Sequence, residues 1–485
     1  MALNVIIVSS EMVPFAKTGG LADVSGELPL ALKKLGMNVT LFMPLYREVI
    51  AKGFKVDPTG VEVSVPLGKR TVTAQVWKGS REGIPVYFLK RDEYFDRTYL
   101  YTTPEGDYFD NLERFIFFSR GVVEAITALG LKPDIVHCND WQTGLIPAYL
   151  KTVYNPALPS TASLFTIHNI AYQGLFPAEL FDLTGLPADI YNPEGLEYWG
   201  QLNLLKSGII FSDIVTTVSE GYSREVQTPE YGCGLEGILQ KRSRDLFGVL
   251  NGVDYSVWNP ETDKLIAANY SRSDLKGKAA CKKDVLKEYS LKLKPGAPLI
   301  GIISRLADQK GFDILVDAME ELMGMDLGMV VLGTGEKKYH ELFEELSGRY
   351  TGKLGVKITF DNSLAHKIEA GCDMFLMPSR YEPCGLNQIY SLRYGTIPVV
   401  RATGGLDDTI DDYGGGEGNG FKFRDYSAAA LAEKVGTAVA VYRDKKAWQE
   451  LQKKAMQCDF SWDRSARRYM ELYNRALTKL RGEDI

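Results

Sequence analysis

The chain has 485 residues, of which 45% are hydrophobic and 24% are charged, so it is too long for one compact core and too apolar to be disordered. Its 56 Lys and Arg residues stand against 62 Asp and Glu residues, a formal net charge of −6, which argues against nucleic acid or acidic lipid as a partner. The six cysteines form no C-x-x-C pair and the four histidines share no metal-ligand spacing, so we expect neither a disulfide scaffold nor a zinc module.

The N-terminal region bears on where the protein works. The chain starts with an apolar stretch over residues 3–8 and shows no basic leader. No apolar run approaches the roughly 18 residues that a membrane span needs. We therefore expect a cytoplasmic protein that has no membrane partner.

Short runs rich in Val, Ile and Phe alternate with amphipathic helical patterns along most of the chain. This alternation predicts an α/β protein in which helices cover parallel sheets. In the first half, a helix is predicted over residues 21–35. The strands predicted there are residues 5–9, 39–43, 86–89, 135–138, 163–167 and 214–218.

A second series of strands follows a turn-rich segment at residues 251–260 and a lysine-rich stretch that reaches residue 298. The interruption predicts two domains, residues 1–253 and 254–460, each with an open sheet. Apolar residues at helical spacing predict a final helix within residues 461–485 that packs back across both domains. The strands predicted in the second domain are residues 299–304, 328–332, 356–360, 374–377 and 397–401, with a helix over 312–322.

Lys17-Thr-Gly-Gly20 follows the first predicted strand and opens the first helix. Backbone amides at that point lie at the positive end of the helix dipole, where a phosphate or a sugar hydroxyl can bind. Gly19 and Gly20 also suit a tight turn, but the adjacent lysine favours an anion site. Because neither the G-x-G-x-x-G nor the P-loop pattern is present, a dehydrogenase or a P-loop ATPase is disfavoured.

Arg305 and Lys310 lie on the loop after the first strand of the second sheet, the place where open α/β sheets bind ligands. Two cations five residues apart suit a diphosphate, since arginine can grip two oxygens and lysine can neutralise the leaving oxygen. Two solvated surface cations are the alternative, and Gly311, which keeps the backbone bare, favours the anion site. The chain contains no Asp-x-Asp pair, so no metal is expected to bridge the diphosphate.

Further polar residues follow other predicted strands. Glu382, in Tyr381-Glu-Pro-Cys-Gly-Leu-Asn387, is expected at the N-terminus of a helix near the Arg305 loop, where it could be catalytic or only compensate the helix dipole. Asp140 and His168 each come shortly after a strand of the first sheet. Lone residues at such places are usually structural, but two clusters facing one cleft predict a polar pocket.

These motifs together closely resemble the bacterial glycogen synthase and plant starch synthase family, in whose order they occur over nearly the whole chain. The resemblance implies a GT-B fold, in which two Rossmann-like domains face one another across a deep cleft. It also implies a retaining transfer of glucose from ADP-glucose to the nonreducing end of an α-1,4-glucan such as glycogen, in glycogen biosynthesis. We expect neither a metal nor a cofactor. The segments that carry the resemblance are Lys17-Thr-Gly-Gly-Leu-Ala-Asp-Val24, Asn139-Asp-Trp-Gln142, Ile167-His-Asn169, Leu250-Asn-Gly-Val-Asp254, Ser304–Gly311, Pro378–Gln388 and Arg401–Leu406.

The resemblance also implies roles for single residues. Arg305 and Lys310 resemble a diphosphate clamp, and Glu382 resembles the carboxylate near the transferred glucose. His168 resembles the residue beside the 6-hydroxyl of that glucose, and Asp140 resembles one needed on the acceptor side. The positions that resemble substrate-binding residues are Lys17, Gly19, Gly20, Asp23, Asn251, Phe360, Cys384, Gly385, Leu386 and Asn387.

Three positions differ from the residues that family relatives carry there. Tyr390 stands where related retaining families carry a second Glu, Phe360 where some members place a Tyr against the adenine, and Asn387 where some have Thr.

Three other interpretations compete with the family. They are a transferase acting on sucrose or a lipid, a two-domain sugar-binding protein without turnover, and a dehydrogenase. The matches over residues 17–24 and 381–388 argue against the first, and the pair of cations argues against the second.

Overall fold

The structure, a computed structural model, describes residues 2–414 and 416–483 and consists of two compact units. The first unit contains Met1–Val218, Ser223–Gly252 and Trp462–Ile485, and the second contains Ser219–Tyr222 and Val253–Ser461. Each unit is built on its own largely parallel sheet, which confirms the predicted two-domain α/β architecture. Within the described ranges, no helix is both long enough and apolar enough to cross a membrane.

The first unit is organised around a nine-stranded sheet with the order β14-β13-β9-β8-β1-β2-β5-β4-β3. Neighbouring strands from β14 to β5 are parallel, whereas β4 is antiparallel to both β5 and β3. The chain passes from β1 to β2 on one side and later places β8 on the other side, so the strand order reverses beside β1. The strands are Asn4–Val8 (β1), Asn38–Pro44 (β2), Asp57–Leu67 (β3), Arg70–Arg81 (β4), Ile84–Lys90 (β5), Ile135–Asn139 (β8), Ala162–Ile167 (β9), Ile214–Thr217 (β13) and Leu246–Gly248 (β14).

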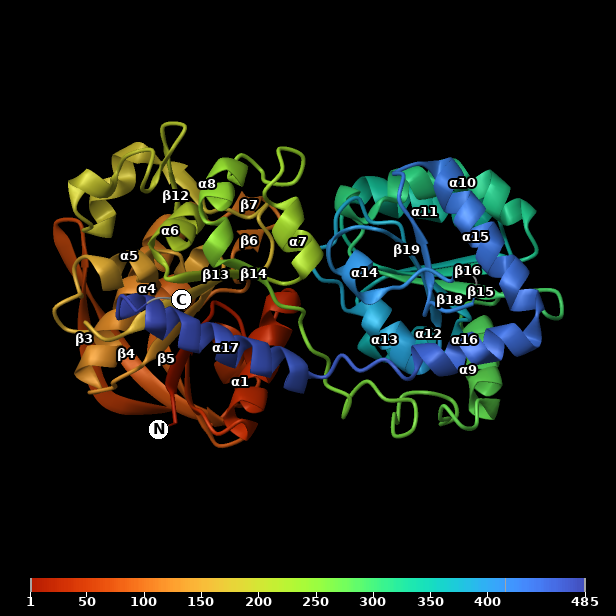
Figure 1. Cartoon of the computed structure of the whole chain (residues 1–485), viewed down its shortest axis with the longest axis horizontal. Helices are drawn as coiled ribbons and strands as arrows, with labels where there is room; N and C mark the ends of the chain where they lie inside the picture. Colours follow the sequence, from red (N-terminus) through yellow and green to blue (C-terminus); the bar gives the residue numbers. More distant parts are fainter. Residues whose placement is uncertain (1, 415, 484–485) are drawn as a thin grey trace. The chain divides into compact units, whose positions relative to one another are not determined.

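Helices and short strands complete the first unit (Figure 1). The helices are Gly20–Lys34 (α1), Arg47–Ala51 (α2), Asp92–Phe95 (α3), Asn111–Ala128 (α4), Leu145–Lys151 (α5), Leu204–Phe211 (α6), Glu236–Lys241 (α8) and Trp462–Leu480 (α17), and Glu220–Glu225 (α7) contains residues of both units. The short strands, which pair as β6-β7 and β10-β12-β11, are Thr102–Thr103 (β6), Gly106–Asp107 (β7), Leu175–Pro177 (β10), Glu197–Tyr198 (β11) and Gln201–Asn203 (β12).

The antiparallel strands β3 and β4 are an addition to the predicted elements. In β3, Val63, Val65 and Leu67 are buried and the residues between them are not. Such alternation is typical of a strand with one solvated face, and it contains no continuous apolar run. The parallel strands β8 and β9 are buried at every position, which explains why the apolar-run criterion detected them and missed the pair.

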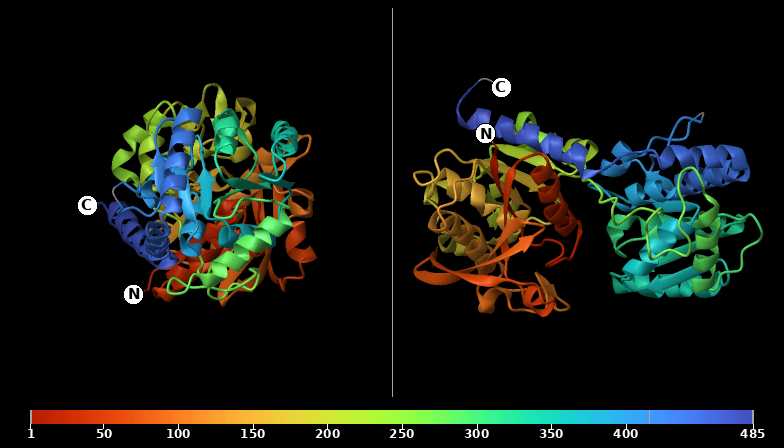
Figure 2. Two further views of the ribbon diagram at one scale, coloured as in Figure 1. Left: turned by 90° about the vertical axis from the view of Figure 1, so that its right-hand side faces the viewer. Right: turned by 90° about the horizontal axis from the view of Figure 1, so that it is seen from below.

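The C-terminal helix α17 packs on the first unit, far along the chain from its partners. Its main contacts are with α1, β9 and β13, and the right-hand view of Figure 2 shows it passing next to α1 in a different direction. Tyr469, Tyr473 and Ala476 are fully buried on its inner face. We predicted a helix that packs across both domains, and the structure groups α17 with the first unit.

The second unit is built on a six-stranded sheet with the order β17-β16-β15-β18-β19-β20, and all neighbours in it are parallel. Helices α10 and α15 cover one face of it, and α9, α12 and α13 cover the other (Figure 1). The strand order reverses between β15 and β18, the place where such sheets bind ligands. The strands are Leu299–Ile303 (β15), Gly328–Gly333 (β16), Leu354–Ile358 (β17), Met374–Met377 (β18), Ile397–Arg401 (β19) and Phe421–Phe423 (β20). The helices are Lys276–Glu288 (α9), Phe312–Gly324 (α10), Lys337–Arg349 (α11), Asn362–Gly371 (α12), Asn387–Tyr394 (α13), Gly404–Thr409 (α14), Ala428–Arg443 (α15) and Lys445–Ala455 (α16).

Candidate active site

A buried ion pair in the second unit lies where the strand order reverses, between β15 and β18. Lys310 comes after β15 and Glu382 after β18, and the Nζ atom of Lys310 lies 2.7 Å from Oε2 of Glu382. The hydroxyl of Ser379 donates a hydrogen bond to the same oxygen at 3.0 Å. Because 15% of the Lys310 side chain and 8% of the Glu382 side chain are exposed, water screens this ion pair weakly.

A glycine lets the two loops that carry this ion pair meet. Gly311 has φ 72°, and a Cβ atom there would lie 2.0 Å from the carbonyl oxygen of Pro378. Next to this contact, the amide of Arg380 donates to the carbonyl oxygen of Gln309 at 2.9 Å. The cation therefore reaches the carboxylate through a close backbone approach that any side chain at position 311 would block.

A pair of glycines after β19 supports the backbone of Glu382. The amide of Gly405 donates to the carbonyl oxygen of Glu382 at 3.1 Å. Gly404 has φ 44°, and a Cβ atom there would lie 2.1 Å from that same oxygen. A Cβ atom at Gly405 would lie 2.0 Å from the carbonyl oxygen of Cys384. The Gly-Gly pair thus holds the Glu382 loop by backbone packing.

The prediction that Glu382 lies at a helix N-terminus is wrong. Helix α13 begins at Asn387 with Leu386 as its N-cap residue, and Gly385, with φ 70°, turns the chain between Glu382 and the helix. The Asn387 side chain donates to the carbonyl oxygen of Ile303 at 2.6 Å, which fixes the start of α13 against the end of β15. In the described part of the chain, the amides of residues 385–387 donate to no backbone carbonyl, so they remain donors for ligand oxygens.

Two other predicted donor-binding residues of this unit are exposed at the same end of the sheet. Arg305, which follows β15, is exposed, and its Nη2 atom lies 3.4 Å from Oε1 of Gln309. Phe360 is 82% exposed and stands two residues beyond the end of β17, because the strand ends at Ile358 and not at residue 360 as predicted. An exposed phenyl ring at that place offers its face to a planar group.

In the first unit, an unpredicted carboxylate, Glu11, occupies the start of α1. It accepts hydrogen bonds from the amides of Thr18 and Gly19, the latter at 3.2 Å, and from the Thr18 hydroxyl at 2.9 Å. Burial raises the pKa of Glu11, and the hydrogen bonds from Thr18 and Gly19 oppose this rise. We predicted that the Gly19 amide contacts the donor substrate, but in the structure this amide donates a hydrogen bond to Glu11. A carboxylate is stabilised at the positive end of a helix just as a phosphate is.

The other predicted residues of this loop lie together at its surface. The Nζ atom of Lys17 lies 2.7 and 2.8 Å from the two carboxylate oxygens of Asp23. Both side chains are partly exposed, and an ion pair of this kind contributes only about 0–1 kcal/mol. Gly20 opens α1 beside them. A ligand with negative charge can therefore compete for Lys17 at little cost.

Strands β8 and β9 bring Asp140 and His168 together, as predicted from their places after the two strands. Oδ1 of Asp140 accepts a hydrogen bond from the backbone amide of His168 at 2.7 Å. Asp140 has φ 56°, a left-handed conformation that is rare outside glycine and is frequent at functional sites. Burial raises the pKa of Asp140 to about 7, although the hydrogen bond from the His168 amide opposes this rise.

The hydrogen bonds around His168 define its tautomer. Its Nε2 atom lies 2.9 Å from Oδ1 of Asn139, and the Asn139 amide group donates to the carbonyl oxygen of Val8 at 3.1 Å. Because this second bond orients the amide, Oδ1 faces the ring and Nε2 carries the proton. Burial lowers the pKa of His168 to about 3. The imidazole is therefore neutral at physiological pH, with Nδ1 as an acceptor.

Two further polar residues of the first unit have different surroundings. Asn251, after β14, is buried, and its Oδ1 atom has no hydrogen-bond partner among the described residues. A buried acceptor without a donor is costly, so this oxygen is suited to a ligand. His137 instead lies 2.9 Å from the Tyr473 hydroxyl and 2.7 Å from Oγ1 of Thr166, which gives it a structural role.

Comparisons with known proteins show which families and which relatives this sequence resembles. A family model of the starch synthase catalytic domain matches residues 4–241, and a model of the glycosyl transferases group 1 matches residues 287–455. Glycogen synthase of Syntrophotalea carbinolica is 47% identical over 98% of this chain and 99% of its own length. Glycogen synthase of Koribacter versatilis is 48% identical over 98% of both chains.

Structural comparisons agree. The catalytic domain of starch synthase IV from Arabidopsis thaliana, bound to ADP and acarbose, is 33% identical, covers 99% of this chain and 100% of its own, and gives a TM-score of 0.90. Sucrose-phosphate synthase from Thermosynechococcus elongatus shares the fold with a TM-score of 0.60 at 16% identity, over 98% of this chain and 100% of its own. The chain therefore belongs to the glycogen synthase and starch synthase family and is a hexosyltransferase with the GT-B fold.

Proposed function

We propose that the protein transfers glucose from ADP-glucose to the nonreducing end of an α-1,4-glucan, with retention at the anomeric carbon, in glycogen biosynthesis. The observation that carries the proposal is the Lys310–Glu382 ion pair at the reversal of strand order, a place where open α/β sheets bind ligands. The related starch synthase IV, solved with ADP and acarbose, supports binding of an adenine nucleotide and a saccharide by this chain.

Arg305 and Lys310 are proposed to hold the diphosphate of the donor. Lysine has three ammonium protons, so Lys310 can keep its bond to Glu382 and still donate to a phosphate oxygen. Arg305 is exposed at the carboxyl end of β15, where its planar guanidinium can bind two oxygens. The amides of residues 385–387 add neutral donors at the start of α13. Together these groups stabilise the negative charge that develops on the departing ADP.

Glu382 is proposed to lie near the anomeric carbon of the transferred glucose. Transfer at this carbon proceeds through a transition state with positive charge on the sugar ring, which a nearby carboxylate stabilises. Ser379 and Lys310 both donate to Oε2 of Glu382, so the orientation of the carboxylate is set before the donor binds. Such preorganisation avoids the cost of turning the carboxylate during the reaction.

The first unit is proposed to supply the residues that handle sugar hydroxyl groups. His168 is neutral and its Nε2 proton is engaged by Asn139, so Nδ1 can accept a hydrogen bond from the 6-hydroxyl of the donor glucose. Asp140, with a pKa of about 7, can accept a proton from the acceptor hydroxyl near neutral pH. We also propose contacts to the donor substrate, ADP-glucose, from Lys17, Asp23 and the buried Oδ1 atom of Asn251.

The adenine is proposed to stack on Phe360. The ring is 82% exposed at the carboxyl end of the sheet, and an aromatic face binds a planar base by dispersion without a hydroxyl group. The remaining predicted contacts are Gly20, the first residue of α1, and Cys384, near the end of the loop between β18 and α13.

The direct test is product analysis with the full chain, ADP-glucose and maltoheptaose. We expect release of ADP and elongation of the glucan without added divalent metal, and a proton NMR spectrum with new α-configured linkages only. Turnover of UDP-glucose with none of ADP-glucose would contradict the donor assignment. A β-configured linkage would contradict retention, and transfer to sucrose or a lipid but not to maltoheptaose would contradict the acceptor.

A further inference from the structure

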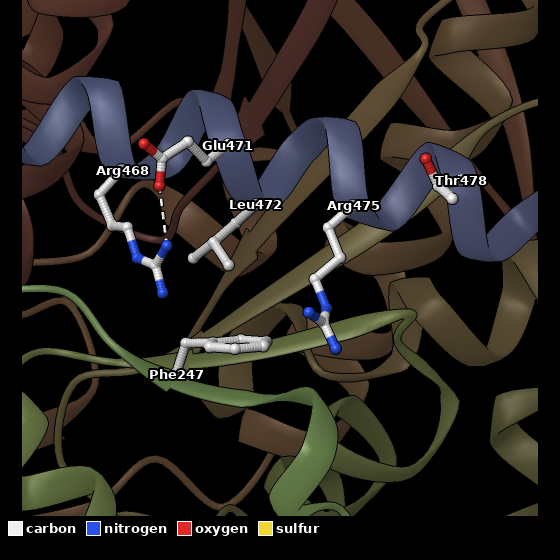
Figure 3. Close-up of a pocket in the computed structure, with 6 residues that line it drawn as sticks. All are labelled: Phe247, Arg468, Glu471, Leu472, Arg475 and Thr478. Carbon is white, nitrogen blue, oxygen red and sulfur yellow. Dashed lines mark hydrogen bonds and ion pairs between the residues drawn. The ribbon is translucent and has the colours of Figure 1, made fainter. Parts of the chain in front are cut away.

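A pocket in the first unit lies between β14, the edge strand of the large sheet, and the C-terminal helix α17 (Figure 3). Its volume is about 370 Å³, which falls within the usual range for small-molecule sites. None of its residues has a part in the proposed transfer reaction. The residues that line it are Phe247, Arg468, Glu471, Leu472, Arg475 and Thr478.

The pocket combines an aromatic floor with two cations. The guanidinium carbons of Arg468 and Arg475 lie 5.6 and 5.0 Å from the centre of the Phe247 ring. The two arginines are seven residues apart on α17 and therefore project from the same side of the helix, two turns from each other. Figure 3 shows both side chains extending from α17 toward the level of the Phe247 ring, with Leu472 between them on the helix.

The two arginines differ in how their charge is compensated. Arg468 donates to the Glu471 carboxylate at 2.7 Å. Arg475 donates from Nη2 to the carbonyl oxygen of Arg244 at 3.2 Å, and its buried Nε atom has no hydrogen-bond partner among the described residues. A carbonyl oxygen carries no net charge, and a buried N–H group without an acceptor is costly. Arg475 is thus suited to an anionic acceptor.

We propose that this pocket binds a phosphate monoester carried on a ring-shaped group, such as a nucleoside monophosphate, with the phosphate on Arg475 and the ring against Phe247. Arginine binds phosphate oxygens in a planar, two-point geometry, and a phenyl face accepts a flat ring. The lining side chains carry two positive charges and one negative charge, and the buried atom without a partner is a donor. Both features favour an anion over a neutral sugar.

The first experiment measures binding of AMP and of inorganic phosphate by calorimetry. The full chain carries Lys310→Gln throughout, so that AMP binding at the proposed donor site is weakened. We expect Arg475→Gln to lower the affinity for both probes at least tenfold. The matched control, Arg467→Gln, removes the same charge from an exposed position of α17 outside the pocket and should leave both affinities unchanged. Equal affinities in the Arg475→Gln variant and its parent would overturn the proposal.

A second pair of variants distinguishes an anion from a neutral saccharide. Glu471→Gln releases Arg468 from its carboxylate partner, so we expect AMP and phosphate to bind several-fold more tightly. Phe247→Leu should weaken AMP and spare inorganic phosphate, since only AMP carries a ring. Binding of maltotriose in place of both anions, lost in Glu471→Gln, would overturn the proposal. Unchanged melting temperatures show that each variant is folded, and the result does not depend on whether the proposed transfer reaction is correct.

Discussion

At the scale of single residues, the two carboxylates that we propose to take part in the transfer have different surroundings. Glu382 receives hydrogen bonds from the ammonium group of Lys310 and from the Ser379 hydroxyl. Asp140 instead accepts a hydrogen bond from the backbone amide of His168, and burial raises the pKa of Asp140 to about 7. One carboxylate is therefore paired with a cation beside the proposed diphosphate site, and the other can exchange a proton near neutral pH.

The raised pKa of Asp140 predicts a pH dependence of stability that the substitution Asp140→Asn removes. An unfolded aspartate has a pKa of about 3.9, so between that pH and about 7 the folded chain holds a proton at Asp140 that the unfolded chain has lost. The contribution of this group to stability is complete below about pH 4 and disappears as the pH rises toward 7. We therefore expect the melting temperature of the wild type, minus that of Asp140→Asn, to fall from pH 4 to pH 7.

Thermal unfolding followed by circular dichroism at four or five pH values measures this difference. Asp57→Asn, a substitution at an exposed position of β3, serves as the matched control for the loss of a carboxylate. A difference between wild type and Asp140→Asn that stays constant, or that rises with pH, would contradict a raised pKa at Asp140.

Sequence reasoning locates the loops of the site better than it locates the partners of each residue. Asp140 and His168 were predicted because they follow buried strands, and the structure joins them at 2.7 Å. Glu11 also comes shortly after a strand and could have been found by the same rule. Ser379 could not, since its role depends on which way the Glu382 carboxylate turns. Partner choice of this kind is set by tertiary packing, which a single sequence does not display.

At the scale of elements, glycines decide how the loops of the second unit meet. Gly404 lies at φ 44°, and a Cβ atom there would approach the carbonyl oxygen of Glu382 to 2.1 Å. We expect Gly404→Ala to lower the free energy of unfolding by about 1–3 kcal/mol, because the substitution adds backbone strain. It should also lower kcat, because the Glu382 loop must shift. Urea unfolding and steady-state kinetics measure the two effects.

Gly348→Ala is the matched control for this prediction. Gly348 lies in α11, and a Cβ atom there would have no neighbour within 4 Å. Alanine is a better helix former than glycine, so this variant should gain up to about 1 kcal/mol and keep its kcat. A Gly404→Ala variant with the stability and rate of the wild type would show that the loop does not depend on this close approach.

The elements themselves were predictable where burial leaves a continuous apolar run. β15, β18 and β19 of the second unit begin where predicted and end within one residue of the predicted bounds, and α17 spans Trp462–Leu480 as its helical spacing indicates. β3 and β4 escaped because their apolar residues alternate with exposed ones. The pairing of β15 with β18 brings Lys310 close to Glu382. This pairing could not be predicted, because the sequence pattern of a strand does not show which strand becomes its neighbour.

At the scale of the whole molecule, the order of the elements along the chain does not match their grouping into the two units. Helix α17 is the last element of the sequence and belongs to the first unit, where the Tyr473 hydroxyl lies 2.9 Å from Nδ1 of the buried His137. The two segments that lead to and from the second unit lie side by side, since the Val253 amide donates to the Phe460 carbonyl oxygen at 2.9 Å. The interruption of the strand series predicted two domains, and we expected α17 to pack across both of them.

The central claim is that Glu382 and Lys310 of the second unit and His168 of the first all take part in glucosyl transfer. The most direct test is kcat with ADP-glucose and maltoheptaose for Glu382→Gln, Lys310→Gln and His168→Ala. Lys337→Gln, which removes a charge from an exposed ion pair of α11, is the control. We expect each of the three to lower kcat at least about 100-fold, the scale for losing a group that stabilises charge in the transition state, with folding retained and the control unaffected. Near-normal rates in all three variants, with unchanged melting temperatures, would contradict this site.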